Sequence, residues 1–233
     1  MLRMIRKIKF SEGEYYHIYN RGVDKREIFM DKNDHERFVL LLEYANLFEA
    51  VNIRNILNQL NQGLPSVNRG ETLVDIGAWC LMPNHFHLLV REKNDAGLSK
   101  FLSKLQTGYS MYFNKRHDRS GALFQGSFKA EHVDKDEYLK YLYSYIHLNP
   151  IKLIQSDWKD NGIYDLERAE LYLEEYSYSS YLDYVGSDRK QKIILNKESF
   201  PEYFDNQTDF KKNIFEWLKF SLPRGDLGKK LST

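Results

Sequence analysis

Two β-prone apolar segments with only Pro83-Asn84 between them constrain the fold more than any other feature of this sequence. Residues 72–82 form a nearly continuous apolar run, and residues 85–90 resume the β-prone pattern after the break. Strands this close in sequence pair antiparallel, because a parallel crossover needs a dozen or more residues. The sequence therefore predicts a hairpin of two central strands.

The other segments alternate between strand and helix patterns. Residues 15–20 are aromatic and β-prone, and residues 121–133 have the pattern of a loop followed by a strand. Apolar residues recur at helical spacing in three segments, two of which follow the expected N-caps Asp34 and Asp134. These helices are predicted at 35–50, 97–114 and 134–148. The order predicts an α+β fold with a ferredoxin-like or RNA-recognition-like antiparallel sheet and helices on one face.

The composition suggests how the chain is divided. Residues 52–71 are rich in Asn, Gln and Gly, which predicts a surface insertion within a main domain spanning residues 10–150. Residues 151–186 are rich in tyrosine and predict a helical extension packed on that domain. Residues 187–233 resemble a small helical C-terminal appendage.

The segment His85-Phe86-His87 is a candidate metal site. Alternate side chains of a strand share one face, so both imidazoles point the same way, with about 7 Å between their backbone positions. Two imidazoles can close onto one metal ion from that separation, although a third ligand must come from elsewhere. The alternative is a strand that carries two polar residues on its wetter face.

A polar helix face supplies a candidate nucleophile and a candidate third ligand. Tyr138, Tyr141, Tyr145 and Asn149 are spaced three or four residues apart, so they form one stripe along the predicted helix. Tyrosine hydroxyls can act as nucleophiles, and an amide oxygen one turn later can bind a metal. The alternative is that these tyrosines are packing residues with a wet hydroxyl.

A local excess of positive charge points to phosphate binding. The net charge is only +1, but the stretch from Lys100 to Lys129 holds six basic residues and one acid, Asp118. Such a patch can bind phosphate even where acids elsewhere cancel the total. The alternative is an ordinary solvated surface.

Several segments in fixed order resemble the REP-associated tyrosine transposases, which belong to the HUH (histidine–hydrophobic–histidine) superfamily of single-strand DNA nucleases. The resemblance rests on PNHFHLLV at 83–90 together with YIHLNPIK at 145–152. Further matches are YNRG at 19–22, YFNKRH at 112–117, GALFQGSFKA at 121–130 and YSSY at 178–181. The resemblance covers residues 10–186, and its specificity lies in the order and spacing of the segments.

The resemblance implies a site and a reaction. It assigns the metal ligands to His85, His87 and Asn149 and the nucleophile to Tyr145, with Tyr141 on the same face as the rival. It implies Mg²⁺ or Mn²⁺ as the cofactor, single-stranded DNA with imperfect-palindrome hairpins as the partner, and a 5′-phosphotyrosine intermediate. We expect DNA phosphates to contact Arg21, Lys104, Lys115, Arg116, Arg119 and Lys129.

Two other functions remain open from the sequence. A non-catalytic module that binds single-stranded nucleic acid explains the basic patch and the aromatic residues but not the histidine pair. A structural metal site lacks further ligands, since the other histidines have no ligand spacing and Cys80 is alone. We expect a cytoplasmic monomer or homodimer, because a lone cysteine allows no disulfide within the chain, residues 1–10 do not resemble a signal peptide, and no apolar run nears the roughly 20 residues of a membrane span.

Overall fold

An antiparallel four-stranded sheet forms the centre of the protein, in the strand order β2-β3-β1-β4. The computed structural model describes residues 9–49, 52–62 and 70–219, so most of the segment 1–10 lies outside the described residues. The strands are β1 (Tyr15–Arg21), β2 (Val74–Met82), β3 (His85–Glu92) and β4 (Lys129–Val133). The predicted hairpin is confirmed, since β2 and β3 pair antiparallel from Val74↔Glu92 to Met82↔His85.

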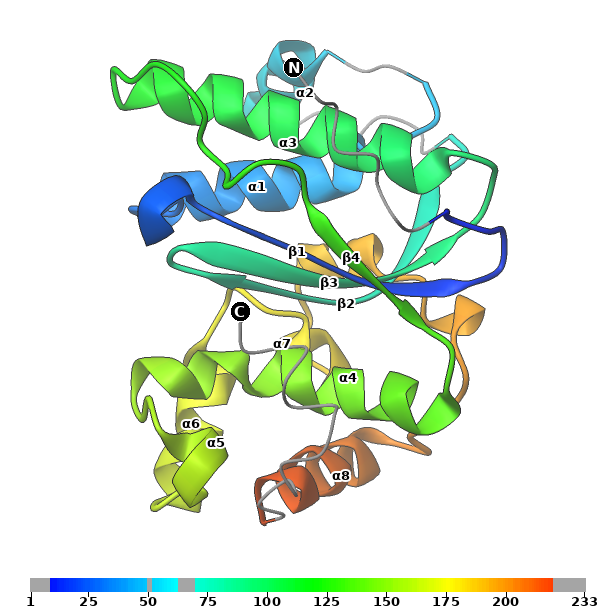
Figure 1. Ribbon diagram of the computed structural model, residues 1–233, viewed down its shortest axis with the longest axis vertical. Helices are drawn as coiled ribbons and strands as arrows, with labels where there is room; N and C mark the ends of the chain where they lie inside the picture. Colours follow the sequence, from blue (N-terminus) through cyan, green and yellow to red (C-terminus); the bar gives the residue numbers. More distant parts are fainter. Residues whose placement is uncertain (1–8, 50–51, 63–69, 220–233) are drawn as a thin grey trace.

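One face of the sheet is covered by α1 (Lys32–Tyr44) and α3 (Gly97–Arg116) (Figure 1). Helix α1 begins before the predicted start because Asp31, rather than Asp34, is its N-cap and accepts the backbone N–H of Asp34. A cap oxygen satisfies one of the backbone donors that a first helical turn leaves free. The expected cap at Asp34 was therefore wrong, and α1 ends at Tyr44 rather than at residue 50, whereas α3 begins at the predicted residue 97.

The opposite face is also covered, which corrects the expectation of helices on one face only. Helix α4 (Asp136–Leu148) crosses this face, and α8 (Gln207–Lys219) packs on α4 (Figure 1). Every residue of β2 is buried, with Trp79 and Leu81 facing α1 and α3 while Ala78 and Cys80 face the α4 side. A continuous apolar strand is typical of a sheet buried on both faces. The predicted α+β class is confirmed.

The C-terminal third of the chain adds short helices to both sides of the sheet, most of them on the α4 side, while the segment around Ile194 packs against α1. After α4 come η2 (Asn149–Leu153), α5 (Trp158–Asn161), α6 (Leu166–Glu175), α7 (Tyr181–Tyr184), η3 (Lys190–Ile194) and η4 (Lys197–Ser199), and then α8. Phe200 packs directly over β2, where a Cβ on Gly77 would lie 2.7 Å from its ring. The described part of the segment after residue 187 therefore contributes to the core, and the domain boundaries at 150 and 186 stay a prediction.

The predicted insertion at 52–71 is partly helical. Asn52 caps α2 (Ile53–Asn61) by accepting the backbone N–H groups of Arg54 and Asn55. The asparagines and glutamines that suggested a loop are instead the exposed face of this helix, while Ile56 is buried. Residues 63–69 of the insertion lie outside the described residues. Among the helices that the structure describes, none is both long and apolar enough to cross a bilayer.

Candidate active site

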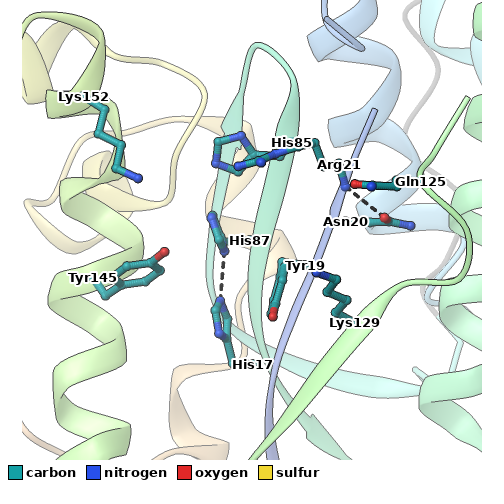
Figure 2. A pocket seen from close by; sticks show the side chains of 10 residues that line it. All are labelled: His17, Tyr19, Asn20, Arg21, His85, His87, Gln125, Lys129, Tyr145 and Lys152. Carbon is teal, nitrogen blue, oxygen red and sulfur yellow. Dashed lines mark hydrogen bonds between the residues drawn. The ribbon is translucent and has the colours of Figure 1, made fainter. Parts of the chain in front are cut away.

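A small polar pocket opens between α4 and the edge of the sheet where β1 ends and β3 begins (Figure 2). Cross-strand pairing sets its geometry, since Tyr19 lies opposite His87 and Arg21 opposite His85. The pocket is lined by His17, Tyr19, Asn20, Arg21, His85, His87, Gln125, Lys129, Tyr145 and Lys152. Residues from four distant parts of the sequence therefore meet at one place.

The histidine pair occupies one face of β3, as strand alternation predicts. The rings of His85 and His87 lie 5.0 Å apart between centroids and are nearly perpendicular, while Phe86 between them packs into the core on the other face. Burial lowers the pKa of His85 to about 3 and that of His87 well below its ordinary value, helped by the positive charge of Lys152 and Lys159. Both imidazoles are therefore neutral at pH 7, which is the form that binds a metal.

Tyr145 faces the histidine pair from α4. Its ring centroid lies 5.4 Å from that of His87, edge to face, and its hydroxyl points into the pocket (Figure 2). Burial raises the pKa of Tyr145 to about 12, opposed by the amide of Asn149 and by the charge of Arg21. Tyr141, the rival on the same helix face, does not line the pocket. From α4, the arrangement presents the phenol of Tyr145 to the two imidazoles.

Asn149 lies one turn after Tyr145 and is fully buried. Its Nδ2 donates a hydrogen bond of 2.8 Å to the Tyr145 carbonyl, whereas its Oδ1 has no hydrogen-bond partner among the described residues. A buried amide oxygen without a partner is costly, so the orphan atom fits a ligand that the protein alone does not supply. Asn149 itself does not reach the surface of the pocket.

The donor set suits a divalent metal with open coordination positions. In the part of the chain that the structure describes, no three His, Cys, Asp or Glu side chains gather into a metal cluster. The groups that could hold a metal are the two neutral imidazoles and the unpartnered Asn149 oxygen, a set that leaves positions open for a substrate.

The sequence reasoning missed His17, which it placed among the histidines without ligand spacing. His17 is fully buried on β1, and its Nε2 lies 2.9 Å from Nδ1 of His87 (Figure 2). Its Nδ1 lies 4.0 Å from Oε2 of Glu131, which also accepts a hydrogen bond from the hydroxyl of Tyr138. The available signal was the alternation in β1, because His17, Tyr19 and Arg21 share one strand face.

The expected basic patch is split between two surfaces. Arg21 and Lys129 line the pocket, whereas the other basic residues lie along or after α3 on the far side of the sheet (Figure 1). There Arg116 is held by Asp31 and Asp34 at 2.6 Å, and Lys104 donates to the backbone carbonyls of Leu47 and Glu49. Arg119 bonds to Asn114, and Lys115 is exposed. The basic residues that were predicted to form one patch are therefore separated in space, and the charge of Arg116 is neutralised by Asp31 and Asp34.

The part of the chain that holds the sheet, the histidine pair and the tyrosine has the sequence of a transposase. Residues 12–149 match the family model described as "Transposase IS200 like". This match spans more than half of the chain, and the protein belongs to the IS200-like transposase family. No curated protein matches the chain.

Solved structures with some similarity cover most of the chain at low identity. A REP-associated tyrosine transposase bound to a REP hairpin is 13% identical, with a TM-score of 0.46 and coverage of 87% of this chain and 96% of the other. A protein from Deinococcus radiodurans that is assigned as a transposase is 14% identical, with a TM-score of 0.34 and coverage of 62% and 95%. The tRNA(His) guanylyltransferase from Saccharomyces cerevisiae is 9% identical, with a TM-score of 0.36 and coverage of 94% and 83%.

Proposed function

We propose that this protein is a metal-dependent transposase that cleaves and rejoins single-stranded DNA, with Tyr145 as the nucleophile. The observation that carries the proposal is the meeting of the Tyr145 hydroxyl with two neutral imidazoles in a pocket lined by Arg21, Lys129 and Lys152. A phenol, a pair of metal ligands and cationic side chains are the groups that a phosphodiester transfer uses.

The reaction follows from these groups. Tyr145 Oη attacks the phosphorus, and the bond from phosphorus to the 3′ oxygen breaks, which leaves a 5′-phosphotyrosine and a 3′-OH. The phenol loses its proton and the departing 3′ oxygen gains one, so atoms and charge balance. Arg21 favours the phenolate form, because its positive charge lowers the pKa of Tyr145 against the effect of burial. One phosphodiester replaces another, so rejoining needs no ATP.

The resident metal would be Mg²⁺ or Mn²⁺, held by His85, His87 and Asn149. When bound, it would neutralise the charge that builds on the oxygens of the scissile phosphate. The cleavage of the bond to the 3′ oxygen, rather than to the 5′ oxygen, is taken from the sequence resemblance to REP-associated tyrosine transposases. The choice of a hairpin substrate has the same source. Whether the protein acts as a monomer or a homodimer stays open.

The covalent intermediate provides the direct test. The full chain is incubated with a labelled single-stranded hairpin oligonucleotide and Mn²⁺, and the denatured mixture is examined for a protein–DNA adduct by electrophoresis. Peptide mapping by mass spectrometry should place the nucleotide on Tyr145. A library of imperfect palindromes guards against a poor choice of hairpin, and a metal-dependent adduct mapped to another residue would disprove the assignment.

The non-catalytic alternative loses support from the fold. RNA-recognition-like modules bind single strands across aromatic residues on an open sheet face. Here α1 and α3 cover one face and α4 covers the other, so the described sheet offers no open platform. The structural metal site also lacks a third strong ligand within the described residues.

DNA contacts are expected mainly from the basic residues at the pocket. Replacing Lys129 with glutamine should weaken binding of a single-stranded hairpin and lower the slope of log affinity against log salt by about one. The reason is that each phosphate contact releases a bound counterion. Fluorescence anisotropy over a salt series measures this slope. Lys115→Gln, at the exposed end of α3, is the matched variant, and an equal loss there would favour the patch along α3 instead.

His17 is expected to position His87 for the metal. If Nε2 of His87 binds the ion, its Nδ1 carries the proton and donates to Nε2 of His17, whose own proton then faces Glu131. Replacing His17 with phenylalanine keeps a ring but removes the acceptor, so the affinity for Mn²⁺ should fall by about 10- to 100-fold. Electron paramagnetic resonance of free Mn²⁺ measures this affinity. His17→Gln retains an acceptor oxygen and should lose less, and an unchanged affinity in His17→Phe would contradict the role.

A further inference from the structure

Two lysines from the segment after α4 lie beside Tyr145. Lys159, in α5, places its Nζ 3.9 Å from the centroid of the Tyr145 ring. Lys152, in η2, lines the pocket itself, and Figure 2 shows its amine and the Tyr145 hydroxyl turned toward the same space. Neither residue was singled out by the sequence pattern as a functional group.

The amino groups of these two lysines have no carboxylate partner among the described residues. Within the described residues, neither lysine forms an ion pair, and the nearest charges include Arg21 and the other lysine of the pair. Asp160 is the carboxylate that acts on Lys159, and its influence is smaller than that of Lys152. Burial followed by the charge of Lys152 lowers the pKa of Lys159 to about 6. Burial and the neighbouring lysine thus disfavour the charged form of Lys159, and no carboxylate among the described residues pairs with either lysine.

A cluster of this kind is unfavourable unless an anion completes it. Removing an ammonium group from water costs free energy, and a second cation nearby adds to that cost. Ordinary structural lysines avoid this by reaching solvent or a carboxylate, as Lys211 does with Glu170 and Glu174. An anion with several oxygens, placed beside the Tyr145 hydroxyl, would satisfy both lysines at once.

We propose that Lys152 and Lys159 form a phosphate-binding pair that holds the DNA phosphate attacked by Tyr145 and retains it once it is esterified to the tyrosine. The proposal rests on the proposed function for the identity of the phosphate, but the affinity of the pair for phosphate does not depend on cleavage. Lys152 and Lys159 belong to the segment after α4, whereas His85 and His87 belong to the sheet. The proposed phosphate would lie between the two lysines and the two histidines.

The first experiment measures phosphate binding without DNA or metal. Inorganic phosphate at millimolar concentration should raise the melting temperature of the full chain above that in chloride of equal ionic strength. The shift should disappear in the Lys152→Gln/Lys159→Gln double variant and persist in Lys135→Gln, an exposed lysine at the start of α4. Absence of the shift in the wild type, or its persistence in the double variant, would disprove the proposal that these two lysines bind phosphate.

Stability without phosphate supplies a second readout that misfolding cannot imitate. Because Lys159→Met removes a buried amine whose pKa is held down by burial and that no carboxylate pairs with, this variant should melt at a higher temperature than the wild type while losing the phosphate response. A lower melting temperature would mean that Lys159 stabilises the fold and would contradict the proposal.

The third measurement connects the pair to the reaction. Lys152→Gln should slow adduct formation with a hairpin oligonucleotide by about 10- to 100-fold, the usual effect of losing a charge-assisted hydrogen bond. Its affinity for Mn²⁺ should not fall, since Lys152 is not a ligand and its positive charge repels a cation held by the histidines. If the phosphate-dependent shift is present but no adduct forms in the wild type, the proposed function fails and the phosphate site stands. If adducts form at the wild-type rate in Lys152→Gln, the pair has no part in the reaction.

Discussion

Tyr145→Phe is expected to eliminate the covalent protein–DNA adduct and to reduce strand cleavage by roughly four orders of magnitude or more. The change removes one oxygen, which is the atom proposed to attack phosphorus, and no other described group at the pocket can form the same ester from α4. Gel analysis of a labelled hairpin with Mn²⁺ measures the adduct and the cut strand together.

The fold should tolerate this change. The edge-to-face contacts of the Tyr145 ring with His87 and His17 do not use the hydroxyl, and phenylalanine preserves them. DNA affinity, measured by anisotropy, should therefore stay within about twofold of the wild type. Tyr141→Phe is the matched control, because Tyr141 lies one turn earlier on the same helix face outside the pocket. Cleavage that survives in Tyr145→Phe and stops in Tyr141→Phe would transfer the role to Tyr141.

Replacing both His85 and His87 with leucine is expected to produce the second large effect. Two of the three proposed ligands disappear, so Mn²⁺ affinity should fall by at least about 100-fold, and cleavage at moderate Mn²⁺ should fall below detection. Leucine is close in volume to histidine, which limits the effect on packing, and it has no atom that binds a metal. Mn²⁺ titration followed by paramagnetic resonance gives the affinity, and the hairpin assay gives the activity.

The matched control for this experiment is His132→Leu. His132 lies on β4 and bonds to Glu14 at the surface, outside the pocket, so its loss should leave Mn²⁺ binding and cleavage unchanged. Circular dichroism should show that both variants are folded. Wild-type metal affinity in the double variant would exclude the histidine pair as the metal site, whatever happens to Tyr145.

Much of the fold could be predicted because its signals are local. The run at 72–82, the Pro83-Asn84 break and the pattern at 85–90 define a hairpin through neighbouring residues alone. The helical spacing of apolar residues likewise placed α3 and α4, with ends that differ by a few residues. Caps proved less predictable, since Asp31 and Asp34 are both suitable and the actual start of α1 depends on which carboxylate reaches a free N–H.

The residues of the candidate site likewise fall into those that local patterns predict and those that only the fold brings together. Strand alternation places His85 and His87 on one face, and helical spacing places Tyr145 and Asn149 on one stripe. These are relations within one element, which the order of residues specifies. The partners that lie on other elements, such as His17 beside His87 or Lys159 beside Tyr145, depend on strand order and on the path of the chain after α4.

The sequence alone therefore determined the α+β class, the central hairpin and the two halves of the candidate site, because each is encoded in periodicities of two or about 3.6 residues. The tertiary structure alone decided that both faces of the sheet are covered, that Arg116 is neutralised by Asp31 and Asp34 while Arg21 and Lys129 reach the pocket, and that Lys152 and Lys159 converge on Tyr145. The physical reason is that burial and the pairing of charges depend on which surfaces meet, and chain order does not specify that meeting.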